Sequence, residues 1–116
     1  MPGAPTLYLA GPMTGYVDFN RPAFRLAAVQ LMAAGYPVRT PLETPEHDAN
    51  GVQRAYTAFL RDDLAILLKA DGVALLPGWS QSKGVMLELH VAAALDMPCR
   101  TIEEWVALAA VRDDRV

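Results

Sequence analysis

Apolar runs and apolar stripes alternate along the chain in a way that predicts alternating strands and helices. Continuous apolar runs such as Gly72-Val73-Ala74-Leu75-Leu76 are typical of strands covered on both faces of a parallel sheet. Four strands are expected, at residues 6–10, 37–40, 72–76 and 97–100. Apolar positions at helical spacing predict four helices, at about 21–34, at about 53–70, from about 83 and from about 101. This alternation implies right-handed crossovers and a parallel sheet, most simply in the strand order 2-1-3-4.

Local signals mark the ends of the helices. Asn20 is a good N-cap with Pro22 in the following turn, and the first helix is expected to stop at Gly35. The stretch Thr101-Ile102-Glu103-Glu104 has the form of a capping box and predicts the start of the last helix. The inner side of that helix is expected to carry Trp105, Leu108 and Val111.

The helix that begins near Lys83 carries a carboxylate on its apolar face. At about 100° per residue, Glu88 falls in the middle of that face, whereas His90 projects from the opposite side. The face is formed by Gly84, Val85, Val91, Ala92 and Leu95. An unpaired carboxylate in an apolar site costs several kcal/mol or takes up a proton, so Glu88 is expected to serve chemistry or ligand binding. The alternative is a solvated Glu88 on a helix that leans on the edge of the sheet.

The loop before this helix, Gly78-Trp79-Ser80-Gln81-Ser82, is small and polar. Backbone N–H groups and hydroxyls therefore converge at a helix N-terminus, where anions such as phosphate bind. Ser82 is expected either to contact a ligand or to serve as a plain N-cap.

A second acidic residue falls on the apolar stripe of the helix at about 53–70. Asp63 lies within the stripe, toward its edge, whereas Asp62 points away. The stripe contains Tyr56, Leu60, Leu64 and Leu67. Two alternatives are that Asp63 is solvated or paired with an arginine.

In open parallel sheets, ligands bind beyond the carboxyl ends of the strands, where the strand order reverses. Here that point falls between the first and third strands, so the loops at 11–20 and 77–82 are expected to meet there. Tyr8, Ser82 and Glu88 are therefore expected to share one pocket, with Asp63 reaching it from the second helix.

The composition narrows the classes of function. The 116 residues, 53% hydrophobic and 20% charged, are typical of one compact soluble domain spanning residues 1–116. A net charge of −3 without a basic run argues against nucleic acid as a partner and favours small ligands. The single Cys99 is expected to be a buried core thiol. No apolar run reaches the ~18 residues of a membrane span and no signal peptide is evident, so a cytoplasmic location follows by default.

Three common classes of site lack their residues. One cysteine and two dispersed histidines do not make a zinc pattern, and no metal or cofactor is expected. Neither His47 nor His90 has an expected place beside a nucleophilic serine, and the Gly11–Gly15 loop is neither a P-loop nor a G-x-G-x-x-G fingerprint. Two carboxylates and a tyrosine remain as candidate site residues.

Paired carboxylates cleave glycosidic bonds. One carboxylate attacks or stabilises the sugar carbon while an acid protonates the leaving group.

Three segments resemble the nucleoside 2-deoxyribosyltransferase superfamily. They are Tyr8-Leu9-Ala10-Gly11-Pro12, Asp63 placed eight residues before Asp71, and Ser82-Lys83-Gly84-Val85-Met86-Leu87-Glu88. Their spacing looks most like that of the 2′-deoxynucleoside 5′-phosphate N-hydrolases and of a poorly characterised phage and bacterial branch, and the resemblance covers roughly residues 6–98. It implies a flavodoxin-like three-layer α/β sandwich with its active site near a homodimer interface.

Carried over position by position, the resemblance implies Glu88 as the nucleophile, Asp63 as the acid that assists departure of the base, and Tyr8 as the group that orients Glu88. The implied substrate contacts are Gly11, Pro12, Met13, Ser82, Lys83 and Gly84. The N-hydrolases carry a phosphate-binding arginine where Met13-Thr14 stand here. The transferases carry an aspartate where Ser82 stands, a difference that favours hydrolysis over transfer.

The expected function is therefore cleavage of the N-glycosidic bond of a nucleoside or nucleoside 5′-monophosphate, with release of the free base. Two alternatives remain. One is a non-catalytic nucleotide-binding or sensing module, because a fold alone does not confer activity. The other is a small oligomerisation scaffold, in which the open edge of the fourth strand is covered by a partner or by the last helix. A homodimer or higher homo-oligomer is expected.

Overall fold

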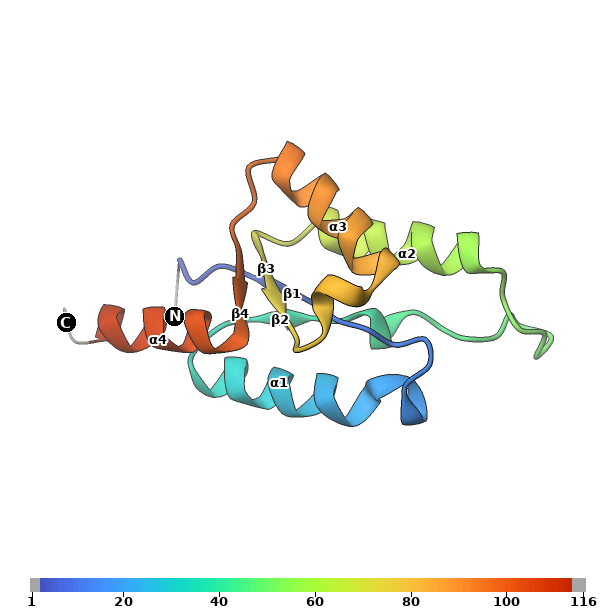
Figure 1. The fold of residues 1–116 in the computed structure, drawn as a ribbon, viewed down its shortest axis with the longest axis horizontal. Coiled ribbons are helices and arrows are strands. Elements are labelled where there is room, and N and C mark those ends of the chain that lie inside the picture. The colour runs from blue at the N-terminus through green and yellow to red at the C-terminus, as the bar shows by residue number, and fades with distance from the viewer. Residues whose placement is uncertain (1–2, 114–116) are drawn as a thin grey trace.

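A four-stranded parallel sheet forms the centre of the fold, and its strand order β2-β1-β3-β4 confirms the order predicted from the sequence (Figure 1). The computed structural model describes residues 3–113. The strands are β1 (Leu7–Ala10), β2 (Val38–Arg39), β3 (Gly72–Leu75) and β4 (Cys99–Thr101). Leu7 pairs with Val38 on one side and with Gly72 on the other. Every residue of β1 and β3 is buried, as expected for central strands covered on both faces.

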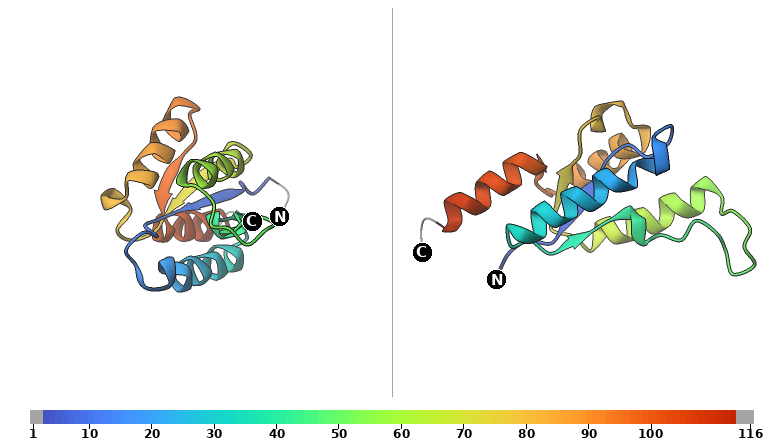
Figure 2. Two further views of the ribbon diagram at one scale, coloured as in Figure 1. Left: turned by 90° about the vertical axis from the view of Figure 1, so that its right-hand side faces the viewer. Right: turned by 90° about the horizontal axis from the view of Figure 1, so that it is seen from below.

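Four helices cover the sheet in two layers. They are α1 (Arg21–Ala33), α2 (Tyr56–Leu68), α3 (Lys83–Ala94) and α4 (Ile102–Asp113). Helices α1 and α4 lie on one face, and α2 and α3 lie on the other (Figures 1 and 2). The result is a three-layer, flavodoxin-like α/β sandwich, in agreement with the expected fold class. None of the helices in the described residues has the length and apolar character needed to cross a membrane.

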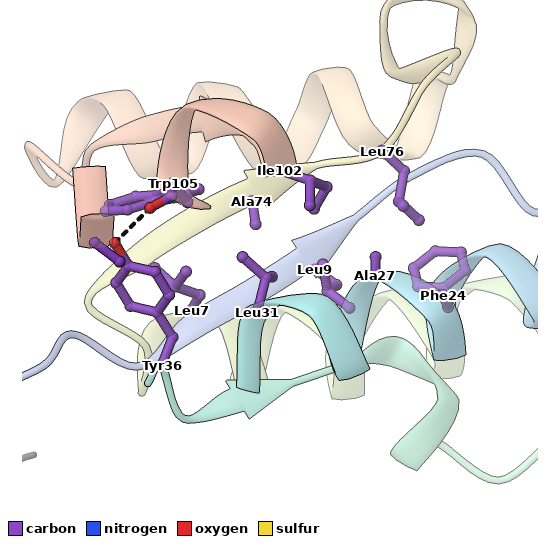
Figure 3. Close-up of a cluster of buried hydrophobic side chains, with 11 residues drawn as sticks. Leu7, Leu9, Phe24, Ala27, Leu31, Tyr36, Ala74, Leu76, Ile102 and Trp105 are labelled. Carbon is purple, nitrogen blue, oxygen red and sulfur yellow. Dashed lines mark hydrogen bonds between the residues drawn. The ribbon is translucent and has the colours of Figure 1, made fainter. Parts of the chain in front are cut away.

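Alternation along β1 divides its side chains between the two layers. Leu7 and Leu9 pack in the cluster with α1 and α4, whereas Tyr8 and Ala10 pack in the cluster with α2 and α3. In the first cluster, the indole N–H of Trp105 donates to the Val73 carbonyl oxygen at 2.8 Å. The hydroxyl of Tyr36 donates to the carbonyl oxygen of Trp105 at 2.7 Å (Figure 3). This face of the sheet is therefore structural, and Tyr8 lies on the other.

Several boundaries and orientations differ from the sequence-based predictions. Helix α2 begins at Tyr56 and not near residue 53, because the segment before it forms a 3₁₀ turn at Pro41–Glu43 and then an extended loop. Three side chains expected on inner faces are exposed, because they lie at or beyond the ends of their helices. They are Tyr56, Leu95 and Val111. Cys99 is only half-buried, because it lies on the edge strand β4.

The two predicted caps have different outcomes. The capping box of α4 is confirmed, since the amide of Thr101 donates to Oε1 of Glu104 at 2.9 Å and the amide of Glu104 donates to Oγ1 of Thr101 at 3.2 Å. Asn20 is confirmed as the N-cap residue of α1, but its side chain makes no cap hydrogen bond to the helix. Asn20 precedes α1 in a left-handed conformation, and its side-chain amide donates to the carbonyl oxygen of Pro12 at 2.9 Å.

Candidate active site

A cleft of about 1420 Å³ opens at the carboxyl ends of β1 and β3. The two strands stay paired up to this edge, where the amide of Leu76 donates to the carbonyl oxygen of Ala10 at 2.9 Å. The loops that follow them are in contact, since a Cβ at Gly78 would lie 2.8 Å from the hydroxyl of Tyr16. The cleft is lined by all nine site residues proposed from the sequence: Tyr8, Gly11, Pro12, Met13, Asp63, Ser82, Lys83, Gly84 and Glu88.

The buried Glu88 side chain lies against Tyr8 at the inner end of this cleft. Glu88 is only 7% exposed and occupies the inner face of α3 between Val85 and Ala92. The hydroxyl of Tyr8, which is fully buried, donates a hydrogen bond of 2.5 Å to Oε2 of Glu88. The structure thus joins two residues that lie 80 positions apart in the sequence.

The environment of Glu88 favours its neutral form. Burial raises the pKa of Glu88 from 4.5 to about 7, the hydrogen bond from Tyr8 opposes this rise, and the nearby Asp63 carboxylate adds to it. Burial, followed by the charges of Glu88 and Asp63, raises the pKa of Tyr8 well above its usual value. Tyr8 therefore keeps its proton and serves as a donor, and Glu88 has a titration that falls close to neutral pH.

Asp63 also lines the cleft and lies on α2, whereas the Glu46 carboxylate of the cleft is paired with Arg21. Burial raises the pKa of Asp63 from 3.8 to about 6, while a hydrogen bond from Thr44 lowers it. The hydroxyl of Thr44 donates to Oδ1 of Asp63 at 2.7 Å. Because Oδ1 already accepts this hydrogen bond, protonation of Asp63 is favoured at Oδ2. Arg54 does not pair with Asp63, because it binds Oδ2 of Asp62 at 2.6 Å.

Thr44 was not among the residues proposed from the sequence. It is buried and directly follows the 3₁₀ turn Pro41–Glu43. At the start of that turn, the amide of Leu42 donates to Oγ1 of Thr40 at 3.1 Å, and the amide of Thr40 donates to Oε2 of Glu43 at 2.9 Å. Arg39 also binds the Glu43 carboxylate at 2.8 Å. The sequence does contain a signal for the turn that places Thr44, because Thr40-Pro41-Leu42-Glu43 has the form of a capping box.

The loop residues of the site have structural roles as well as places in the cleft. Ser82 is the N-cap of α3, where its Oγ accepts from the amide of Val85 at 3.3 Å. A Cβ at Gly11 would lie 2.7 Å from the Leu76 side chain, so glycine is required for close packing there. Gly84 has more room, since the nearest atom to an added Cβ is the hydroxyl of Tyr56 at 3.7 Å.

The cleft also holds aromatic and basic side chains that were not proposed from the sequence as site residues. Tyr16 and Phe19 come from the loop after β1, and Tyr56 comes from the start of α2. Arg21 bonds to Asp18 and Glu46, which ties the loop after β1 to the segment before α2. Within residues 3–113, no group of three histidine, cysteine, aspartate or glutamate side chains is placed to hold a metal ion.

Comparisons with known proteins place the chain in a sequence family and show its fold. The family model "Domain of unknown function (DUF4406)" matches residues 5–101, a span that contains every site residue named above. A solved structure described as "Crystal structure of conserved protein from Enterococcus faecalis V583" is similar, with a TM-score of 0.68 and 20% sequence identity. The similarity covers 85% of this chain and 63% of that chain, and it shows the fold alone. Among curated proteins, none matched the chain.

Proposed function

The chain belongs to the DUF4406 family, and we propose that it is an enzyme that cleaves the N-glycosidic bond of a nucleoside or nucleoside 5′-monophosphate. The observation that carries the proposal is the buried Glu88 carboxylate, hydrogen-bonded to Tyr8 inside an open cleft that also contains Asp63. Burying a carboxylate costs stability, so its presence in an accessible cleft supports a chemical role. The motif resemblance to nucleoside 2-deoxyribosyltransferases supports the reaction class.

In the first step, an oxygen of ionised Glu88 attacks the anomeric carbon of the sugar. The bond between that carbon and the base nitrogen breaks, and its electron pair leaves with the base. Asp63 donates the proton on Oδ2 to the departing base, so the base leaves neutral. The hydrogen bond from Tyr8 stabilises the ionised form of Glu88 and holds it in the attacking orientation.

In the second step, water attacks the anomeric carbon of the glycosyl-enzyme. Asp63, now ionised, takes a proton from the water, and the bond to Glu88 breaks with its electron pair returning to the carboxylate. The product is the free sugar or sugar phosphate, and both side chains regain their starting protonation. Hydrolysis is proposed over base exchange because Ser82, which caps α3, stands where the transferases carry an aspartate.

The reactive form of the site carries one proton across two carboxyl groups. Glu88 must be ionised and Asp63 protonated, and the two groups titrate close together, at about 7 and about 6, so the shared proton lies mainly on Glu88 and the reactive arrangement is the minor form of the singly protonated pair. Coupled groups of this kind lose their protons in two steps that belong to the pair. The singly protonated pair is therefore most populated between about pH 6 and 7, which is close to neutral.

The test is incubation of the purified protein with a panel of ribonucleosides, deoxyribonucleosides and their 5′-monophosphates, followed by chromatography for the free base. Glu88→Ala is run in parallel, with Glu103→Gln on the exposed surface of α4 as the control. Base release that is lost in Glu88→Ala and kept in Glu103→Gln supports the proposal. No release from any member of the panel, at high enzyme concentration and long times, contradicts it and favours a nucleotide-binding module. Such a module would still be stabilised against heat by the nucleotides that it binds.

A further inference from the structure

The exposed aromatic side chains of this protein are gathered at one place. In the described part of the chain, the large aromatic residues with substantial exposure are Tyr16 at 46%, Phe19 at 49% and Tyr56 at 62%, and all three line the cleft. The remaining aromatic side chains are buried or half-buried. Exposed aromatic surface is unfavourable in water, and its concentration at a single concave site indicates a ligand with a matching apolar surface.

Phe19 lies in a strained stretch of backbone. Asp18, Phe19 and Asn20 have φ values of 52°, 49° and 63°, so three consecutive residues other than glycine adopt the left-handed conformation. Each such residue costs free energy, because Cβ approaches the following carbonyl oxygen. A run of three persists only where the surrounding structure holds it, and strain of this kind is concentrated at functional sites.

The contacts that hold this strained turn are specific. Asn20 donates its side-chain amide to the carbonyl oxygen of Pro12 at 2.9 Å, which fixes the turn to the start of the same loop. Arg21 binds Asp18 at 2.7 Å and also pairs with Glu46. The Arg21 guanidinium lies over the Phe19 ring, 5.3 Å from its centroid. One face of the ring is therefore covered by protein, while the ring remains half exposed at the cleft.

We propose that Phe19 is a specificity-determining residue, whose ring stacks on a planar aromatic base of the substrate while the carboxylates deeper in the cleft face the sugar. The inference rests on the proposed function for the identity of the substrate as a nucleoside or nucleotide. A rigid, flat aromatic surface with one face already occupied is suited to a flat ring. Glu88 and Asp63 offer polar groups to the sugar, so the aromatic part of the substrate belongs at the aromatic wall of the cleft.

The test measures binding without turnover, in a Glu88→Gln background, by calorimetry or by NMR titration. The probes are the four deoxynucleoside 5′-monophosphates and, as a ligand without a base, 2-deoxyribose 5-phosphate. At least one nucleotide is expected to bind more tightly than the sugar phosphate. Phe19→Ala is expected to weaken nucleotide binding by about 10-fold, the size of one lost base stack, and to leave sugar phosphate binding unchanged.

Matched variants separate stacking from simple loss of bulk. Phe19→Tyr keeps a ring and is expected to bind within about 2-fold of the parent, a difference well below the loss of a stack. Phe19→Leu keeps apolar bulk without a flat face and is expected to lose affinity as Phe19→Ala does. Met32→Ala, an exposed apolar residue of α1 outside the cleft, is the control and is expected to change nothing. Phe19 is half exposed, so each variant is expected to fold, and a thermal melt checks this.

The strained backbone has its own test. Asn20→Ala removes the bond to Pro12 and disfavours the left-handed conformation, so it is expected to weaken nucleotide binding as Phe19→Ala does. Asn20→Gly also removes the bond but accepts the conformation freely, so it is expected to keep more of the affinity. Equal binding by both variants and by the parent would overturn the positioning of Phe19 by this turn.

Several outcomes overturn the inference. They are nucleotide affinity that is unchanged in Phe19→Ala, an equal loss for the sugar phosphate, full affinity in Phe19→Leu, and no binding of any nucleotide. Failure of the proposed function looks different. If the nucleotides bind with the expected dependence on Phe19 but the unmodified enzyme releases no base, the stacking site stands and the glycosidase proposal fails. If base is released and Phe19→Ala leaves KM unchanged, the proposed function stands and the stacking site fails.

Discussion

The hydroxyl of Tyr8 donates a 2.5 Å hydrogen bond to Oε2 of Glu88, and both side chains are buried. Tyr8 lies in the central strand β1 and Glu88 in the second turn of α3. The bond therefore links the sheet to the helix that covers it, and it places a donor against the one strongly buried carboxylate of the described residues. A hydrogen bond to a carboxylate favours its ionised form, which is the form required of a nucleophile.

Replacing Tyr8 by phenylalanine is expected to remove this stabilisation of the Glu88 carboxylate. A hydrogen bond to a charged group contributes about 1.5–3 kcal/mol, so a loss of about 10- to 100-fold in kcat/KM is predicted. The pKa of Glu88 is also expected to rise, because the bond from Tyr8 lowers it. The measurement is kcat/KM for base release as a function of pH.

Tyr36→Phe is the matched control for Tyr8→Phe. Its hydroxyl also donates a buried hydrogen bond, to the carbonyl oxygen of Trp105, on the opposite side of the sheet from Tyr8. Both variants are expected to lose some stability, but only Tyr8→Phe is expected to change the pH profile. Identical profiles for the two variants would show that the bond to Glu88 has no role in the reaction.

Glu88 is also expected to make the stability of the protein depend on pH. Its pKa is about 7 in the folded protein and near 4.5 in the unfolded chain, so the folded protein binds the proton more tightly. The free energy of unfolding therefore falls as pH rises through this window. The difference between the two pKa values of Glu88 corresponds to a decrease of about 3 kcal/mol in the free energy of unfolding. Glu88→Gln removes the dependence, and it is expected to be more stable than the parent at pH 8 but not at pH 4.

Urea unfolding of both proteins at several pH values measures this difference. Glu103→Gln is the control, because Glu103 is exposed in the first turn of α4. An ionised carboxylate at a helix N-terminus is mildly stabilising, so this variant is expected to show a small effect of the opposite sign. A Glu88→Gln variant whose stability runs parallel to that of the parent at every pH would contradict the burial of an ionisable Glu88.

Thr44 is expected to set the protonation of Asp63 through its hydrogen bond to Oδ1. The dependence of kcat/KM on pH is expected to be bell-shaped, with its maximum between about pH 6 and 7. The bond from Thr44 lowers the pKa of Asp63, so Thr44→Val is expected to raise that pKa by about one unit. Because Asp63 has the lower of the two pKa values, the acid side of the bell is expected to move upward most, and the maximum shifts toward about pH 7.

Thr44→Ser keeps the hydroxyl and is expected to titrate like the parent. The most direct readout is a ¹³C NMR titration of the aspartate carboxyl carbons in the free protein, which requires no activity. Equal Asp63 titrations in Thr44→Val and Thr44→Ser would show that the Thr44 hydroxyl does not set the pKa of Asp63.

Gly11 and Gly84 both line the cleft, but they are expected to tolerate alanine differently. A Cβ at Gly11 would meet the Leu76 side chain at 2.7 Å, so Gly11→Ala is expected to lower stability by about 1–3 kcal/mol through overpacking. At Gly84 the nearest atom is 3.7 Å away, and alanine is a better helix former than glycine. Gly84→Ala is therefore expected to be neutral or stabilising. Thermal or urea unfolding compares the two, and equal losses would contradict the packing role of Gly11.

The sequence predicts the framework of the protein well because its signals there are local and periodic. The apolar runs of β1 and β3 identify central strands, and connection rules lead to the observed strand order. The position of Glu88 on a helical wheel predicts its burial, which the structure confirms. The helical wheel wrongly predicts that Leu95 is buried. It gives the direction of the side chain but not the end of the helix, and Leu95 lies beyond the last residue of α3.

The details of the site depend on contacts that no local pattern specifies. The bond between Thr44 and Asp63 crosses from a loop to a helix, and only the packing of both against the sheet brings them together. The left-handed turn at Asp18-Phe19-Asn20 is held by Pro12 and by the ion pairs of Arg21. Asparagine and aspartate have only a weak preference for this conformation, and phenylalanine has none. The exposed Phe19 ring therefore could not be placed in the cleft from sequence.

The stereochemistry of the reaction tests most directly whether Glu88 is the nucleophile. A β-nucleoside substrate identified from the panel is cleaved in the presence of methanol, and the methyl glycoside is examined by ¹H NMR. Two displacements through a Glu88 intermediate restore the original configuration, so the β-methyl glycoside is expected. The α-methyl glycoside would show direct attack on the substrate, and it would contradict a covalent role for Glu88.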